Sequence, residues 1–135
     1  AQKTRVEEFT SKAVAYIDEN GTAAAYAAFN APNPLPAFKD EELYVFVIDI
    51  SDASNEIAIM VSHGFKDELI GQNRYNMQDE NGKYIVRDFI ELTKNSDRSW
   101  SWYNWEDPTD NKVKKKFSYL IKSGALIVGA GTYLN

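Results

Sequence analysis

Hydrophobic residues recur with a helical period along the first part of the chain. The apolar positions of this stripe lie three or four residues apart, at Val6, Phe9, Ala13, Tyr16 and Ile17. Their spacing predicts helix within residues 4–29, interrupted at Asn20-Gly21, a pair that favours a left-handed helix stop. Thr22 can cap a second, shorter helix. The pattern therefore predicts a long N-terminal helix followed at once by a short one.

A two-residue alternation marks strands in the remainder of the chain. Residues 43–50 are largely β-branched or aromatic, and residues 57–61 return as a hairpin partner after a Ser/Asp/Asn turn. Residues 83–94 show helical spacing again, and residues 100–133 indicate three consecutive strands. This order predicts an α+β domain: a PAS-like five-stranded antiparallel sheet with a long N-terminal helix and flanking short helices.

Alternation divides the aromatic side chains between the two faces of the predicted sheet. Tyr44 and Phe46 share one face of the first strand. In the strand that begins at residue 100, the two sets are Trp100, Trp102 and Asn104 on one face and Ser101, Tyr103 and Trp105 on the other. We interpret one face as core. The other, where Tyr103 and Trp105 join Tyr44 and Phe46, combines apolar area with polar donors, which suits a small polar ligand.

A run of lysines begins the next predicted strand, and the pattern must decide which of their side chains points into the domain. Alternation over residues 114–121 places Lys115 on the face of Tyr119 and Lys116 on the opposite face. A lysine that faces inward needs a carboxylate partner or an anionic ligand, because a buried unpaired ammonium is costly. Alternatively, every lysine of the run extends its charged end into water. The pattern leaves both interpretations open.

Composition narrows the classes of function. The length of 135 residues predicts one domain, and the aromatic fraction of 13% favours a recognition surface. A net charge of -5, with basic residues concentrated only at 112–116, predicts that nucleic acid is not a partner. The absence of cysteine excludes thiol catalysis and disulfides. No apolar run reaches the roughly 20 residues that cross a bilayer, so membrane contact is expected only through a flanking segment.

His63 is the one histidine and the main candidate for chemistry. The sequence carries no nucleophile elbow, phosphate-binding loop or zinc-protease motif. A metal site at His63 would have to be completed by carboxylates alone, so we expect neither a metal nor a cofactor. Three roles remain for the imidazole: a structural hydrogen bond, donation to an anionic ligand, or acid–base catalysis with an Asp or Glu.

Several segments together resemble the single Cache domains, which are extracytoplasmic sensor modules of bacterial chemoreceptors and histidine kinases. The resemblance runs nearly the whole length of the chain, in the order AVAYIDENGTAAAYAAFN (13–30), LYVFVID (43–49), SHGFKDELIGQN (62–73), DENGKYIVRDFIEL (79–92), WSWYNWEDP (100–108), KFSY (116–119) and IVGAGTY (127–133). It implies a PAS-like fold over residues 1–135 and a pocket for a small carboxylate such as acetate, propionate, lactate or pyruvate.

The resemblance also implies which residues form the pocket. Carried over by position, they are Tyr44, Phe46, His63, Trp100, Tyr103, Trp105, Lys116 and Tyr119, with Phe38 as a lid. For Phe38 the residues alone allow two positions, a lid over the site or a plug in the core, and base rates favour the plug. Lys116 would neutralise the carboxylate, while Tyr103 and Tyr119 would donate hydrogen bonds. Because alternation separates Lys116 from Tyr119, this grouping requires a bulge or a lysine that reaches round the strand. Whether Lys115 or Lys116 faces the pocket stays open.

Our hypothesis is a periplasmic or extracellular domain that binds a small anionic metabolite, feeds signal transduction or chemotaxis, and performs no catalysis. A chain that begins at Ala1 without methionine fits a removed signal peptide or a trimmed receptor. The N-terminal helix is the candidate surface for a homodimer. One alternative is a structural or protein-interaction module whose aromatic face is simply core. Another is a small hydrolase-type enzyme that uses His63.

Overall fold

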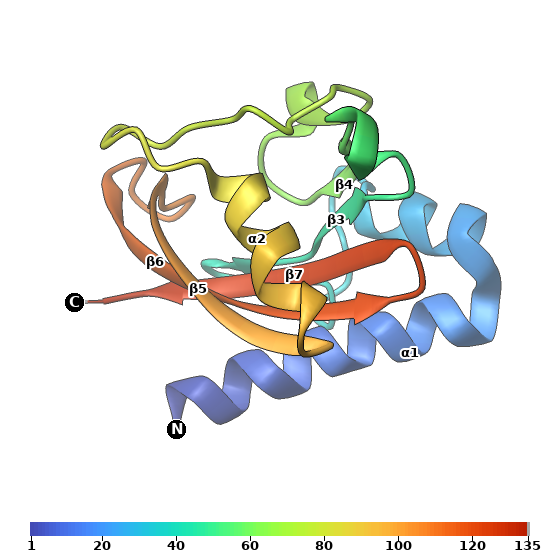
Figure 1. Cartoon of the computed structure of the whole chain (residues 1–135). Helices are drawn as coiled ribbons and strands as arrows, with labels where there is room; N and C mark the ends of the chain where they lie inside the picture. Colours follow the sequence, from blue (N-terminus) through green and yellow to red (C-terminus); the bar gives the residue numbers. More distant parts are fainter. Residues whose placement is uncertain (135) are drawn as a thin grey trace.

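Five antiparallel strands form the central sheet of the protein, in the spatial order β4-β3-β7-β6-β5 (Figure 1). The structure is a computed structural model that describes residues 1–134. The strands of this sheet are β3 (Phe46–Asp49), β4 (Ile59–His63), β5 (Arg98–Glu106), β6 (Val113–Ser123) and β7 (Leu126–Tyr133). A separate two-stranded ribbon pairs β1 (Lys39–Asp40) with β2 (Leu43–Tyr44). The predicted α+β, PAS-like class is confirmed.

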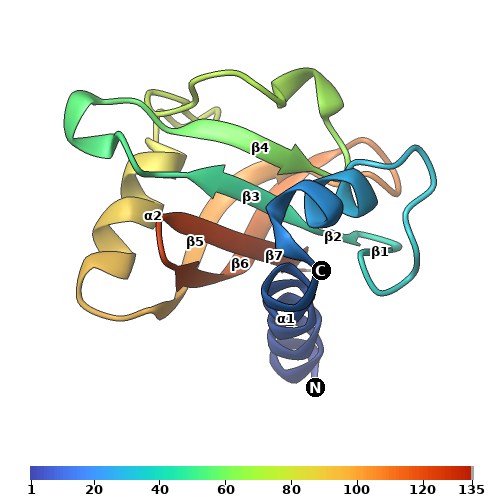
Figure 2. The ribbon, with the colours of Figure 1, turned by 90° about the vertical axis from the view of Figure 1, so that its right-hand side faces the viewer.

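The long helix α1 (Gln2–Phe29) covers one face of the sheet and contacts β6 and β7 (Figure 1). Its residue Gly21 has φ 82° and ψ 166°, which is not helical. Only glycine adopts such angles readily, so the helix bends there. Figure 2 shows the part after Gly21 set at an angle to the part before it. The predicted stop is therefore present, as a kink within one element.

The second helix, α2 (Ile85–Lys94), lies over the other face of the sheet (Figure 1). Two hydrophobic clusters result, one between the sheet and α1 and one between the sheet and α2. Val45 and Val47 belong to the α1 cluster, whereas Tyr44 and Phe46 belong to the α2 cluster. Alternation predicted this division. We name the two sides the α1 face and the α2 face.

Three local details differ from the sequence-based expectation. The strand expected over residues 43–50 is interrupted at Val45, whose backbone N–H donates to the carbonyl of Phe38 at 3.2 Å. The register between β3 and β4 shifts between Val47 and Ile48. The strand expected over residues 57–61 begins and ends two residues later, as β4, and its last residue is His63. The register shift matters because it decides which β4 side chains reach the α2 face.

The pairing of β5 with β6 fixes the direction of the lysine run. Tyr103 lies opposite Lys116 and Trp100 lies opposite Tyr119, without a register shift in this pair. Lys116 therefore reaches the α2 face by ordinary alternation, and Lys115 is exposed. The expected bulge in this strand is wrong. The residue that faces inward is Lys116.

The segment between β4 and α2 is held against the edge strand β5. Lys66 Nζ pairs with the Glu106 carboxylate at 3.3 Å. Asp79 Oδ2 accepts a hydrogen bond from the backbone N–H of Asn104 at 3.0 Å. Such contacts protect an edge strand from pairing with another chain. They also keep the segment above the α2 face.

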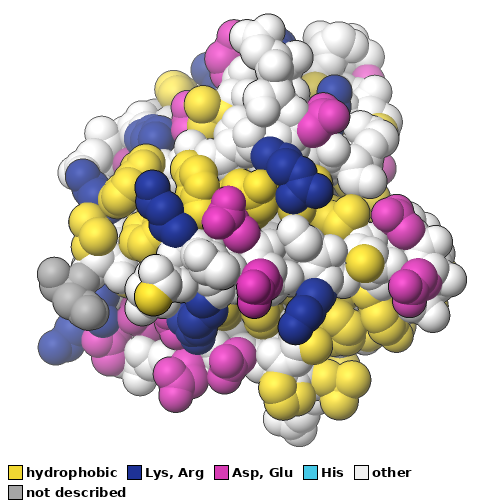
Figure 3. Space-filling model, turned by 90° about the horizontal axis from the view of Figure 1, so that it is seen from below, with side chains coloured by type: hydrophobic (Ala, Val, Ile, Leu, Met, Phe, Trp, Pro, Cys, Tyr) yellow, Lys and Arg dark blue, Asp and Glu magenta, His cyan; other side chains and the backbone are white. Residues whose placement is uncertain are grey.

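The outer surface on the α1 side carries charges of both signs (Figure 3). Acidic and basic side chains are interspersed there with apolar ones, so no single-sign field dominates this view. A homodimer through α1 stays a prediction. Within residues 1–134, no helix combines the length and apolar character that a bilayer crossing requires.

Candidate ligand-binding site

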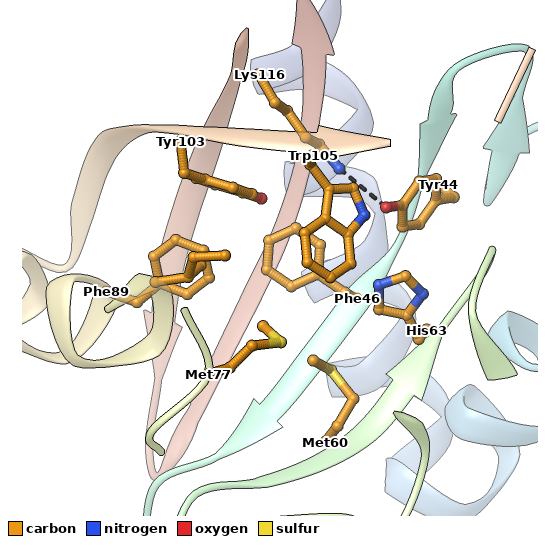
Figure 4. Close-up of a pocket in the computed structure, with 10 residues that line it drawn as sticks. Tyr44, Phe46, Met60, His63, Met77, Phe89, Tyr103, Trp105 and Lys116 are labelled. Atoms are coloured by element: carbon orange, nitrogen blue, oxygen red, sulfur yellow. Dashed lines mark hydrogen bonds between the residues drawn. The ribbon is translucent and has the colours of Figure 1, made fainter. Parts of the chain in front are cut away.

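A small cavity lies on the α2 face, between the sheet, α2 and the segment after β4 (Figure 4). Its walls are formed by Tyr44, Phe46, Met60, His63, Met77, Ile85, Phe89, Tyr103, Trp105 and Lys116. The cavity volume is about 10 Å³, which is room for about one water molecule. Any organic ligand must therefore displace side chains as it enters.

Lys116 supplies a buried cation to this cavity. Its side chain is 1% exposed, and Nζ donates a hydrogen bond to the Tyr44 hydroxyl at 3.1 Å. Nζ also lies 4.2 Å from the centroid of the Tyr44 ring. Among the described residues, no carboxylate forms an ion pair with it. Burial lowers the pKa of Lys116 to about 7, although Asp107 and Glu42 oppose the shift from a longer distance.

Two glycines of β7 make room for the cavity wall. A Cβ atom at Gly131 would lie 2.8 Å from Lys116 Cε and 2.6 Å from the Phe117 carbonyl oxygen. A Cβ atom at Gly129 would lie 2.5 Å from Cε1 of Phe46. All three distances are shorter than packed atoms allow. The glycines of the C-terminal strand thus permit Lys116 and Phe46 to cross over β7.

His63 is held as a neutral hydrogen-bond donor. Its Nδ1 accepts the backbone N–H of Lys66 at 2.8 Å and that of Phe65 at 3.3 Å, so the ring proton resides on Nε2. Burial lowers the pKa of His63 well below its ordinary value, and the charges of Lys116 and Lys66 add to this effect. The ring centroid lies 4.9 Å from that of Tyr44, at the cavity wall.

Three further polar groups complete the wall. The buried indole N–H of Trp105 lies beside the Tyr44 hydroxyl but forms no hydrogen bond of ordinary geometry among the described residues (Figure 4). The Tyr103 hydroxyl lies 2.8 Å from Ser118 Oγ, and burial raises the pKa of Tyr103, as it does that of Tyr44. Because Tyr44 accepts from Lys116, its own O–H proton is left to donate. The cavity therefore presents donors and one cation, without a carboxylate among its described lining residues.

The described residues contain no group of three or more His, Cys, Asp or Glu side chains placed to hold a metal ion. His63 in particular turns Nδ1 towards backbone N–H groups. The chemistry that this wall can perform is recognition of an acceptor, above all an anion.

Six of the nine predicted pocket residues meet at the cavity: Tyr44, Phe46, His63, Tyr103, Trp105 and Lys116. These six come from the five strands β2, β3, β4, β5 and β6. Figure 4 shows them converging on one space. Their placement is the one that alternation indicated for the shared aromatic face. A role of these residues in binding stays a prediction.

The other three lie on the α1 face. The Phe38 ring packs 4.8 Å from the Tyr16 ring, inside the α1 cluster. Trp100 and Tyr119 lie 5.0 Å apart on that same face. The expectation that Trp100 and Tyr119 line one pocket with Tyr103 and Lys116 is wrong, because an offset of three residues along a strand reverses the side-chain direction. Phe38, in the turn before β1, takes the core position rather than that of a lid.

Sequence reasoning missed four wall residues: Met60, Met77, Ile85 and Phe89. A signal existed for the last two, which lie four residues apart on the apolar stripe of α2. Met60 depends on the register shift in β3–β4, and Met77 on the path of an irregular segment. Both features are set by packing between elements rather than by a local sequence signature.

The sequence profile of the Cache domain matches residues 3–135. A solved structure of a methyl-accepting chemotaxis protein from Vibrio parahaemolyticus is similar, with a TM-score of 0.78, 22% identity, and 98% of this chain and 88% of that chain covered. The periplasmic sensor domain of a chemotaxis protein has a TM-score of 0.69 and 22% identity, covering 94% and 86% of the two chains. A Cache chemosensory domain studied for carboxylic acid recognition gives 0.69 and 17%, covering 94% and 84%. At these identities the likeness concerns the fold.

Proposed function

This chain belongs to the Cache domain family, and we propose that it binds a small organic monocarboxylate in the cavity around Lys116. Family membership supports an extracytoplasmic ligand-sensing role. The proposal adds the class of ligand, the residues that hold it, and a periplasmic or extracellular setting in which binding feeds signal transduction or chemotaxis. The domain binds its ligand and does not transform it.

One observation carries the proposal: the amino group of Lys116 is fully buried and has no carboxylate partner among the described residues. Removing a cation from water costs several kcal/mol unless an opposite charge compensates. A protein retains such a group where its charge has a use. A carboxylate that enters the cavity supplies the missing counter-charge.

The neighbouring donors suit the other acceptor positions of a carboxylate. Two carboxylate oxygens accept about four hydrogen bonds. Lys116 Nζ, the Tyr44 O–H and His63 Nε2–H provide three donors at the wall, and Trp105 Nε1–H, which makes no other hydrogen bond of ordinary geometry, provides a fourth. Hydrogen bonds to an ionised acceptor are about twice as strong as neutral ones. We expect the carboxylate to bind at this end of the cavity.

One of the similar structures adds support by analogy. It is a Cache chemosensory domain studied for carboxylic acid recognition, at 17% identity to this chain. At that distance its ligand does not transfer with the fold. The argument for a carboxylate here rests on the chain's own Lys116.

A second candidate is a structural or protein-interaction module in which the aromatic face is only core. The cavity volume of about 10 Å³ favours it, because a nearly filled space is what a core contains. In that case no ligand would offset the free-energy cost of burying the Lys116 side chain. Binding measurements separate the two candidates.

We do not favour a hydrolytic role for His63. Acid–base catalysis in the usual dyad requires a carboxylate that orients the imidazole. Here Nδ1 accepts two backbone N–H groups instead, and no carboxylate bonds to the ring among the described residues. The same arrangement supports donation from Nε2 to a bound anion.

Titration calorimetry and thermal unfolding with acetate, propionate, lactate and pyruvate test the proposal, with sodium chloride at equal ionic strength as control. A ligand at a hundred times its Kd stabilises the folded state by about 2.7 kcal/mol. For a domain of this size, that raises Tm by roughly 5–10 °C. If none of the four acids produces heat or shifts Tm, the proposal fails and the filled-core candidate replaces it.

A further inference from the structure

The cavity has two chemically different ends (Figure 4). Lys116 and Tyr44 lie at one end, where the hydrogen bond between them is drawn. Met60 and Met77 lie at the other end, towards the segment after β4. The remaining walls beside the methionines are apolar, formed by Phe46, Ile85 and Phe89. A ligand that fits both ends carries one negative charge and a hydrocarbon tail.

We propose that this site selects monocarboxylates with an unsubstituted apolar tail, such as propionate and butyrate. This inference rests on the proposed function. The site discriminates against 2-oxo and 2-hydroxy acids, dicarboxylates and amino acids. The chemical class thus becomes short saturated fatty acids rather than short carboxylates in general.

The charge of the wall excludes two classes of acid. Lys116 is the one cationic side chain among the ten described wall residues, so the second carboxylate of succinate would face Met60 and Met77 without a counter-charge. The ammonium group of an amino acid needs an anionic or carbonyl acceptor, and no wall residue carries a carboxylate. We expect both classes to bind at least a hundredfold more weakly than propionate.

Hydrogen bonding discriminates against substituents next to the carboxylate. The donors at the cationic end are matched by the carboxylate oxygens, and the Tyr103 hydroxyl is already paired with Ser118 Oγ at 2.8 Å. A hydroxyl or keto oxygen at C2 would then lie against the rings of Phe46 and Phe89. Burying a polar group without a partner weakens binding roughly 5- to 100-fold.

The methionines provide the space that the tail needs. They are the two methionines of the whole chain, and their thioether side chains have three rotatable bonds. By contrast, the Phe46 and Phe89 rings are stacked at 5.7 Å, and Phe89 packs edge-on against Tyr103 at 5.5 Å. The wall therefore opens at Met60 and Met77. Each added methylene should tighten binding about fourfold until the tail fills that end.

Calorimetric Kd values for acetate, propionate, butyrate, lactate, pyruvate, succinate and alanine test this inference. We expect butyrate to bind more tightly than propionate and propionate more tightly than acetate, with the other four weaker than propionate. Lactate or pyruvate binding more tightly than propionate would overturn the inference. If Lys116→Met then abolished that binding, the proposed function would stand. Failure of every monocarboxylate to bind would instead overturn the proposed function itself.

Substitution of Met77 tests the position of the tail. Met77 is half-buried in an irregular segment, so Met77→Ala should fold. We expect it to shift the preference towards pentanoate by at least fivefold relative to propionate, while the acetate Kd changes less than twofold. The control Met77→Leu should keep the original order. Equal changes for acetate and pentanoate would show that the tail does not reach Met77, and the inference would fail.

Discussion

Replacement of Lys116 by methionine should stabilise the protein and abolish carboxylate binding. Burial lowers the pKa of Lys116 from its ordinary value of 10.5 to about 7. At about 1.4 kcal/mol per pH unit, burying the charged form costs roughly 5 kcal/mol below pH 7. Methionine removes this cost at similar volume. It also removes the hydrogen bond to Tyr44 and the contact with its ring, together about 1.5–3 kcal/mol.

The expected net effect of Lys116→Met is a gain of about 1–4 kcal/mol at pH 6, in the range found when buried charges become apolar. Urea unfolding at pH 6 measures it, and calorimetry with propionate should show an affinity loss of a hundredfold or more. Lys115→Met is the matched control, because Lys115 is one residue away on the same strand and exposed. It should change stability by less than about 0.5 kcal/mol and leave binding intact.

Two results would refute this reasoning. One is a Lys116→Met protein that still binds propionate with the original affinity, which would place the anion elsewhere. The other is a loss of stability of several kcal/mol, which would show that Lys116 is compensated within the fold. The charge would then have a structural use rather than a ligand.

Three other predictions follow from the site. The pKa of Lys116 is about 7 in the folded state and 10.5 in the unfolded state, so the unfolded chain binds more protons between these pH values. The Lys116 contribution to the free energy of unfolding should therefore rise from pH 7 to pH 10.5. Urea unfolding of the original protein and of Lys116→Met measures this, and a difference between the two that does not change with pH would contradict it. Propionate affinity should fall up to tenfold per pH unit above about 7, as neutral Lys116 must take up a proton to bind; a constant calorimetric Kd from pH 6 to 9 would oppose this. Gly131→Ala should cost about 1–3 kcal/mol and weaken propionate binding, because its Cβ would displace Ser118 Oγ, the nearest atom, together with Lys116 Cε. Unchanged unfolding and binding would show that the wall tolerates the methyl group.

The division of aromatic residues between the two faces could be predicted from alternation alone. Tyr44 with Phe46, and Tyr103 with Trp105, share the α2 face as their spacing requires. What alternation does not state is which face a helix fills completely. The answer depends on the position of α1, whose apolar side chains pack against β6 and β7 and fill the α1 face.

The assignment of Lys116 and Tyr119 to one pocket came from the family resemblance, and it is wrong. Strict alternation already placed Lys116 and Tyr119 on opposite faces of the sheet, and the structure shows the same arrangement. Grouping the two in one pocket required a bulge that β6 does not contain. The register shift lies in β3–β4 instead, at Val47 and Ile48. A bulge of this kind is settled by packing against neighbouring elements, so local sequence did not reveal it.

The most direct test of the central claim is a crystal structure of the protein grown with propionate. We expect a carboxylate oxygen within about 3.2 Å of Lys116 Nζ, the range of a charged hydrogen bond. Difference density for propionate at another site, such as the α1 face beside Trp100 and Tyr119, with the space around Lys116 still closed, would contradict the account.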